Sequence, residues 1–296
     1  MGKGAMMKRT LLPLLLAPCL VHGEVENAIL PFFDVARTYV RGTGGLDAGR
    51  GDMESFDFVA RSVITPEPRI GDWFVVPFFD YRFTSINVDG APAAFPTDDV
   101  DLHSLALSTF LVHMEDTSPW FYGGWGRAEL ASDFQHIDGD DFTFDLCAGA
   151  GYRFSDRFTL ALGAAVINLN GDPQWFPGLN FDWKISDCLS AGIYGPSGLI
   201  VYQPAADWMF TLRGDPAGGV WNITDNAGDS RSLDWSAYRA GAYVSRRIVR
   251  ELWFTAGGGA VFSGDLDRTT PAGRRIASAD PGTGWFGLVG LRLRAW

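Results

Sequence analysis

The stretch "DDFTFDLCAGAGYRF", residues 140–154, decides the fold class. Every second position from Phe142 to Phe154 carries an apolar side chain, and the positions between them carry polar or very small ones. Successive side chains of a β-strand point to opposite faces, so this segment predicts a strand with one apolar and one polar face. Two structures use such strands: a soluble sheet with one face on a dry core, and a membrane barrel with lipid outside and water inside.

The same alternation recurs in "SFDFVARSVI" (55–64), "WFVVPFFDYRF" (73–83) and "WFPGLNFDWKI" (175–185), where the charges collect on one face. Connections alternate between short turns and long loops, which is typical of a transmembrane antiparallel up-and-down β-barrel. We predict an all-β chain of about fourteen strands, or twelve if the short pair at 188–204 is misassigned. The expected strands are 33–41, 54–64, 72–86, 98–114, 119–132, 140–154, 157–169, 177–186, 188–195, 198–204, 207–214, 231–246, 251–264 and 284–296.

The N-terminus predicts a signal peptide over residues 1–23, because three basic residues flank a short apolar run at 11–21. Residues 24–296 then form a single barrel domain. The run ending at Cys19 resembles a lipoprotein cleavage box, but Pro18 stands where a small residue is expected, so lipidation at Cys19 is the less favoured interpretation.

Composition restricts the partners. Removing residues 1–23 takes three of the 24 basic residues and leaves 35 acidic ones, a net charge of about −14, which argues against nucleic acid. No later run of apolar residues is long enough for a transmembrane helix, so membrane crossing requires a closed sheet. Cys147 and Cys188 fall on strands too far apart for a disulfide and are expected to be free thiols. No cofactor is indicated.

Aromatic residues lie near the expected short turns, where rings with a polar tip prefer the boundary between lipid and water. We therefore predict an interfacial girdle. Its expected members are Trp73, Trp120, Tyr122, Phe158, Trp183, Tyr202, Trp208 and Trp253.

The last segment, "GWFGLVGLRLRAW" (284–296), resembles the closing strand of bacterial outer-membrane β-barrel proteins. The chain is also similar to barrel families of unassigned function in "FPGLNFDWKIS" and "GLIVYQPAADWMFTLRG". The resemblance implies export to the bacterial outer membrane, contact with its lipid and lipopolysaccharide, and recognition of the last strand by the barrel assembly machinery. Trp296 departs from the pattern, since it is one residue out of phase with Leu291 and Leu293.

The charged face is the main candidate for function. Its side chains would project into the lumen, where mixed charge holds water and sorts polar solutes. This favours a passive pore or binding channel for small polar solutes, and the alternative is a salt-bridged interior that only stabilises the wall. The pore-lining candidates are Asp57, Arg61, Asp80, Arg82, Arg127, Glu129, Asp145, Arg153, Asp182 and Lys184.

Other functions have weaker support. His103 and His113 share one face of a strand and could serve an outer-membrane hydrolase, but no nucleophile motif accompanies them, so we expect lumen-facing histidines without catalysis. No catalytic or metal-binding residue is assigned. A secreted soluble β-sandwich that binds a ligand is the remaining alternative. "HIDGDD" (136–141) predicts a solvated acidic loop, with cation bridging to lipopolysaccharide as its alternative.

Overall fold

The computed structural model describes residues 32–43, 53–63, 69–88, 100–115, 117–169, 172–225, 228–249, 252–270 and 273–294. The predicted signal peptide, Cys19 and Trp296 lie outside these ranges. No helix among the described residues is long and apolar enough to cross a membrane. The elements are β1 (Phe32–Thr43), β2 (Met53–Val63), β3 (Arg69–Ile70), β4 (Trp73–Val88), β5 (Val100–Met114), β6 (Trp120–Ser132), the 3-10 helix η1 (Gly139–Asp141), β7 (Phe142–Ser155), β8 (Phe158–Leu169), β9 (Asp172–Lys184), β10 (Leu189–Tyr194), β11 (Ser197–Ala205), β12 (Trp208–Thr224), β13 (Ser230–Val249), β14 (Leu252–Thr269), β15 (Arg275–Ala279) and β16 (Gly284–Arg294).

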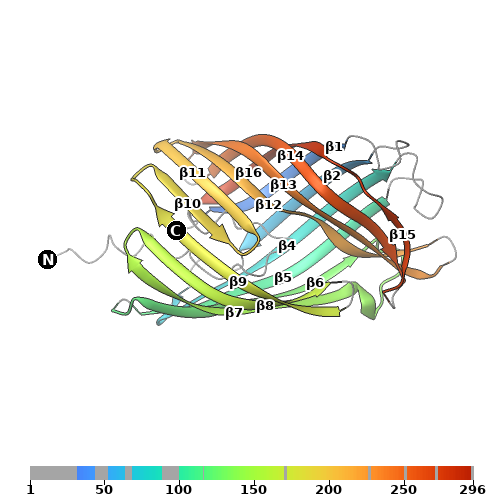
Figure 1. The fold of residues 1–296 in the computed structure, drawn as a ribbon, viewed down its shortest axis with the longest axis horizontal. Helices are drawn as coiled ribbons and strands as arrows, with labels where there is room; N and C mark the ends of the chain where they lie inside the picture. Colours follow the sequence, from blue (N-terminus) through green and yellow to red (C-terminus); the bar gives the residue numbers. More distant parts are fainter. Residues whose placement is uncertain are drawn as a thin grey trace.

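Fourteen of the sixteen described strands close into one ring (Figure 1). Each pairs antiparallel with its neighbours in the chain, and β16 pairs back with β1 through the register Phe32↔Arg294 to Thr43↔Gly284. The two short strands β3 and β15 lie outside the ring and pair only with β4 and β14. The predicted up-and-down barrel is therefore confirmed, and the β-sandwich alternative is wrong because one sheet closes on itself.

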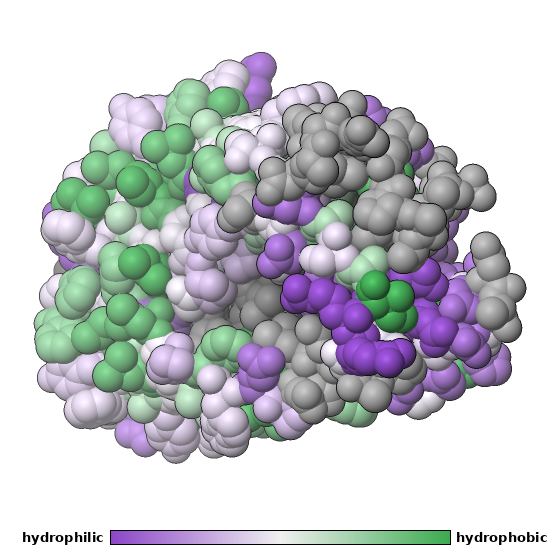
Figure 2. All heavy atoms as spheres, turned by 45° about the vertical axis from the view of Figure 1, so that its right-hand side comes forward, coloured by the Kyte–Doolittle hydropathy of each residue, from purple (hydrophilic) through white to green (hydrophobic). Residues whose placement is uncertain are grey.

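The alternation of 140–154 separates the outside of the barrel from its lumen. Phe142, Phe144 and Leu146 are exposed on the outer face, whereas Cys147 is buried on the inner one. Figure 2 shows hydrophobic residues spread over the strand wall, while hydrophilic residues gather at one end. An apolar exterior on a closed ring is the pattern of a transmembrane barrel.

Two ends of the barrel are distinguished by their connections. The turn end carries tight turns such as 155–158 and 205–208, and the loop end carries the longer connections. The aromatic girdle is present at the turn end, where Trp120, Tyr122 and Trp183 are exposed. The prediction that Trp253 belongs to the girdle is wrong, because its side chain is fully buried inside the lumen. Both faces of its strand carry apolar residues, so the sequence alone does not show which face meets the lipid.

Three strands extend five or more residues further than the sequence predicts. β9 begins at Asp172 instead of residue 177, β12 continues to Thr224 instead of residue 214, and β14 continues to Thr269 instead of residue 264. Pro173 and Pro216 lie in the added parts of β9 and β12, where proline favours a loop because it cannot donate a hydrogen bond to a neighbouring strand. The prolines are accommodated because they lie on strand edges that have no neighbour, as described below.

Beyond Gly214 the loop-end half of β12 separates from β11 and, still paired with β13, crosses the lumen (Figure 1). It reaches β6, where Asn222 pairs with Ser132 and the Asp133 N–H donates to the Asn222 carbonyl at 3.0 Å. The crossing passes through Gly218, whose φ of +105° is unfavourable for residues with a side chain. A Cβ there would lie 1.9 Å from the Trp235 carbonyl oxygen, so glycine is required at this position.

The lumen is layered. Inward side chains at the turn end form an apolar cluster that includes Phe78, Trp125 and Trp253. A second apolar cluster at the loop end includes Leu102 and Trp221. Between the two, the inner faces of β2, β4, β6, β12 and β13 carry charged side chains.

Candidate functional site

The charged residues between the apolar clusters form what we call the charged layer. The strands bring them together because they lie at equivalent inward positions around the ring. Its members are Asp57, Arg61, Asp80, Arg82, Arg127, Glu129, Arg213, Asp215 and Arg239.

Arg82 links the wall to the crossing segment of β12. Its Nε and Nη2 donate to Asp57 Oδ1 at 3.1 and 2.8 Å, and its Nη1 donates to the Gly218 carbonyl at 2.7 Å. The Thr84 hydroxyl donates to the same Asp57 oxygen at 2.6 Å. The guanidinium also lies 5.5 Å from the centre of the Trp221 ring. One arginine thus fixes both the acid beside it and the strand that crosses the lumen.

Arg61 and Arg127 approach the same space from β2 and β6. Arg61 forms an ion pair with Asp80 and lies 4.6 Å from the centre of the Phe78 ring. Arg127 Nη2 donates to Glu129 at 2.7 Å, while its buried Nε has no hydrogen-bond partner among the described residues. A buried N–H without a partner is costly, so this donor is available to a bound acceptor.

The sequence reasoning missed three members of the charged layer. Arg239 donates from Nε and Nη2 to Asp215 Oδ2 at 2.9 and 2.6 Å, and Arg213 lies 3.2 Å from Asp215 Oδ1. Residues 215–230 were interpreted as a loop, which removed Asp215 from consideration. The alternation of Thr211, Arg213 and Asp215 with Phe210 and Leu212 was the signal that could have found them.

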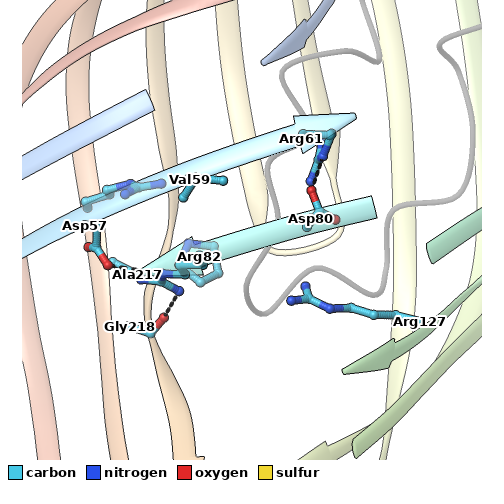
Figure 3. Close-up of a pocket in the computed structure, with 10 residues that line it drawn as sticks. Asp57, Val59, Arg61, Asp80, Arg82, Arg127, Ala217 and Gly218 are labelled. Atoms are coloured by element: carbon cyan, nitrogen blue, oxygen red, sulfur yellow. Dashed lines mark hydrogen bonds and ion pairs between the residues drawn. The ribbon is translucent and has the colours of Figure 1, made fainter. Parts of the chain in front are cut away.

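A cavity that is partly open to solvent lies inside the charged layer. Four guanidinium groups but only two carboxylates line it, together with backbone of the crossing segment. Figure 3 shows the Arg127 side chain, which comes from β6, pointing towards the side where Arg82 and Gly218 lie. The excess of planar guanidinium donors over carboxylates suits a ligand that carries a carboxylate or phosphate. The lining residues are Asp57, Val59, Arg61, Asp80, Arg82, Arg127, Pro216, Ala217, Gly218 and Arg239.

The structure brings six of the ten predicted pore-lining residues into the charged layer and places four elsewhere. Asp145 pairs in register with Arg127 at the edge of the layer. Arg153 and Asp182 lie closer to the turn end on inward positions. Lys184 lies at the turn itself, half exposed and 3.7 Å from Asp187.

The two histidines are on the outer face, so the expectation that they face the lumen is wrong. His103 Nδ1 lies 3.0 Å from the Tyr81 hydroxyl, and its ring stacks on Phe134 at 5.0 Å. His113 stacks on Tyr122 at 4.7 Å. Both imidazoles belong to aromatic clusters at opposite ends of the wall, and neither faces the charged layer.

The remaining candidate ligands are dispersed. Cys147 is buried and Cys188 exposed, and neither forms a disulfide with another described residue, as predicted. No group of three or more histidine, cysteine or acidic side chains among the described residues could hold a metal ion.

The acidic loop at 136–141 is only partly solvated, which corrects the expectation. Asp141 is buried at the end of η1, and its carboxylate accepts from the Asp138 N–H at 2.8 Å. The Asp138 side chain accepts in turn from the Asp140 N–H at 2.9 Å, completing a capping box. Burial raises the pKa of the Asp141 carboxyl above its ordinary value.

Comparison with known proteins gives a family but no activity. Residues 107–269 match the model of a family described as a domain of unknown function, DUF6268. No curated protein matches the chain.

Several solved structures share the general architecture at low similarity. The KdgM porin in complex with disordered oligogalacturonate is 9% identical, with 88% of this chain and 98% of that chain covered and a TM-score of 0.33. The deltaS2 mutant of the TodX monoaromatic hydrocarbon channel is 9% identical, with 93% and 94% covered and a TM-score of 0.38. A Pseudomonas aeruginosa FadL homologue is 10% identical, with 97% and 96% covered and a TM-score of 0.34.

Proposed function

The chain belongs to the DUF6268 family, whose model matches more than half of its length, and from that premise we propose that it is a bacterial outer-membrane channel that binds small polar anions in its charged layer. The observation that carries this proposal is the cavity, where four arginines face two aspartates and Arg127 keeps a buried Nε–H without a partner. Guanidinium groups recognise carboxylate and phosphate through paired hydrogen bonds, which are strong in a site of low dielectric.

Passage through the barrel requires the apolar clusters above and below the charged layer to part. Trp221 belongs to the loop-end cluster, and Phe78 and Trp253 belong to the turn-end cluster. Apolar constrictions of this kind gate channels by excluding water. In this proposal the charged layer selects the solute and the apolar clusters control its movement.

The localisation and the partners of the barrel follow from the same proposal. Outward side chains such as Phe144 and Leu162 would contact membrane lipid and lipopolysaccharide. The alternating residues of β16 would be recognised by the barrel assembly machinery when the ring closes against β1. Loops at the longer end would face the cell exterior and the tight turns the periplasm.

Ion selectivity in planar bilayers tests the proposal. We expect reversal potentials under a salt gradient to show a preference for anions, and Arg127→Gln to shift them towards cations. Arg153→Gln is the matched control, because Arg153 is also a half-buried inward arginine but does not line the cavity.

Binding to the pure protein in nanodiscs of zwitterionic lipid gives a second readout. Calorimetric titration with methyl phosphate should show binding that Arg127→Gln weakens and Arg153→Gln does not. The proposal would be contradicted if Arg127→Gln and Arg153→Gln had the same ion selectivity and the wild-type protein did not bind methyl phosphate.

A further inference from the structure

The ladder of hydrogen bonds around the barrel is interrupted on one side of the loop end. β10 and β11 form a short hairpin whose turn at 195–196 lies partway along the neighbouring strands (Figure 1). β9 pairs with β10 only over residues 180–184, and β12 pairs with β11 only up to Gly214. Beyond the hairpin, within the described ranges, β9 pairs only with β8, and β12 with β13 and at Asn222 with β6.

The edge of β9 that faces this interruption cannot easily pair with another strand. The Leu179 carbonyl points to the hairpin, where it accepts from the Gly195 N–H at 3.1 Å, and the Lys184 N–H points the other way to β8. Alternate residues of a strand point their backbone groups to the same side, so Pro173 and Pro177 face the interruption together with Leu179. Proline has no N–H, and both positions therefore lack the donor that a new neighbour would need.

The opposite edge, on β12, pairs with β6 at Asn222 but lacks a donor at Pro216. The carbonyl oxygens of Gly218 and Asn222 point away from β13, towards Arg82 and Asp133. The register between β12 and β13 is unbroken, so Pro216 also directs its missing N–H away from β13 and into the interruption. Prolines on both edges disfavour hydrogen bonding between β9 and β12 at this place.

The base of the interruption is held by two contacts at the hairpin tip. The Gly195 N–H also donates to Asn180 Oδ1 at 3.0 Å, and the Tyr238 hydroxyl donates to the Pro196 carbonyl at 2.6 Å. Directly below the tip, two buried polar groups have no hydrogen-bond partner among the described residues, Asn180 Nδ2 and the Ser197 hydroxyl. These inward groups can bind a polar head that enters above them.

The interruption and the cavity share a wall. Pro216, Ala217 and Gly218 lie on the β12 edge that faces the interruption, and the same three residues line the cavity with the arginines. On its membrane side the interruption is bordered by two exposed apolar residues of β9, Trp175 and Leu179. An apolar border outside and arginines inside match a molecule with an acyl chain and an acidic head.

We propose that the gap between β9 and β12, above the β10–β11 turn, is a lateral opening through which a single-chain amphiphile with a phosphate or carboxylate head moves between the bilayer and the arginine-lined cavity. This rests on the proposed function and specifies its ligand. The acidic head binds the cavity arginines while the acyl chain extends through the opening into the membrane.

Two ligands with the same head separate this route from simple anion binding. Dodecyl phosphate and methyl phosphate are titrated into the protein in nanodiscs of zwitterionic lipid. We expect dodecyl phosphate to bind at least about tenfold more tightly than methyl phosphate. Equal affinities would overturn the lateral opening and leave the proposed function standing, whereas no binding of either ligand would overturn both.

A matched pair of variants places the route at the opening. Leu179 and Leu162 are cross-strand partners on the outer face and lie at the same depth in the membrane, but only Leu179 borders the opening. Leu179→Asp should weaken dodecyl phosphate binding by about tenfold through charge repulsion and leave methyl phosphate binding unchanged. Leu162→Asp should change neither, and an equal effect of both variants would contradict the proposal.

A measurement without ligand covers the case in which Leu179→Asp fails to fold. A bimane label is placed on Ala217→Cys or on Val59→Cys, both of which line the cavity, after Cys147 and Cys188 are replaced. Phospholipid that carries a nitroxide on its acyl chain should quench the label at position 217, on the edge of the opening, and not at position 59. Absence of quenching at both positions would show a closed wall and overturn the proposal.

Discussion

Tyr238 on β13 donates its hydroxyl hydrogen to the carbonyl oxygen of Pro196, 2.6 Å away, at the tip of the β10–β11 hairpin. To reach it, the tyrosine ring passes over β12 at Gly214, where an added Cβ would lie 3.2 Å from the ring. The contact ties the shortest hairpin of the ring to a strand that is not its neighbour.

Tyr238→Phe should release this hairpin tip. Loss of one hydrogen bond is expected to lower the free energy of unfolding by about 1 kcal/mol. The Gly195 N–H, which bonds Leu179 and Asn180, should then exchange faster with solvent deuterium. Tyr202→Phe is the control, since Tyr202 is an outward tyrosine of the same hairpin, and faster exchange in both variants would refute the role of Tyr238.

Arg82 and Asp57 should show strong energetic coupling. Arg82→Gln or Asp57→Asn alone leaves a buried charge without its partner and should lower the free energy of unfolding by about 3 kcal/mol. The double variant should lose clearly less free energy of unfolding than the two single variants lose in sum. The control cycle is Arg157 with Asp187, an exposed pair at 3.4 Å that should show almost no coupling. Additive losses at Arg82 and Asp57 would contradict the described geometry.

Trp221→Ala should both destabilise the barrel and increase its conductance. The side chain is 1% exposed in the loop-end cluster, and its Nε1 donates to Ser104 at 3.2 Å. Removing a buried ring of this size costs about 3–5 kcal/mol and leaves a void in the apolar constriction. Trp175→Ala, at a residue that is 75% exposed, should have little effect on either property. Unchanged single-channel conductance in Trp221→Ala would exclude the loop-end cluster as a constriction.

Asp141→Asn should change how stability depends on pH. The folded-state pKa of Asp141 is raised by burial, so its contribution is fully present below the ordinary carboxyl range and is lost as the pH rises through the raised value. The melting temperature of the wild type should therefore fall as the pH rises from the ordinary carboxyl range through the raised pKa, and Asp141→Asn should not show this fall. Asp140→Asn, at the exposed neighbouring residue, should behave like the wild type. An identical pH profile for all three proteins would count against a buried, charged Asp141.

The alternation of apolar and polar residues was sufficient to predict the barrel and its fourteen strands. It also indicated the inward positions of Asp57, Asp80 and Arg82, because a charged side chain on one face of an otherwise apolar strand determines which face meets water. His103 and Trp253 were assigned to the wrong face for the opposite reason. Their strands carry apolar side chains on both faces, so only the cross-strand register determines their orientation.

Proline and glycine caused the remaining differences. Pro173 and Pro216 favour loops when each strand is assumed to have two neighbours, and they are compatible with strands here because they lie at an unpaired edge. Asp215 was missed because it follows the predicted end of the strand 207–214, whereas Arg213 lies inside that strand. Their approach to Arg239 depends on long-range pairing between β12 and β13, which no local pattern in the sequence contains.

The short β10–β11 hairpin also changes how the barrel fits a membrane. The six residues of β10 extend about 20 Å, or about 15 Å along the membrane normal at ordinary strand tilt, which is less than the apolar band of about 25 Å on outer-membrane barrels. Lipid beside this hairpin must thin locally or the whole barrel must lean towards it. We therefore expect the protein to sit asymmetrically in its bilayer and to favour membranes with shorter acyl chains.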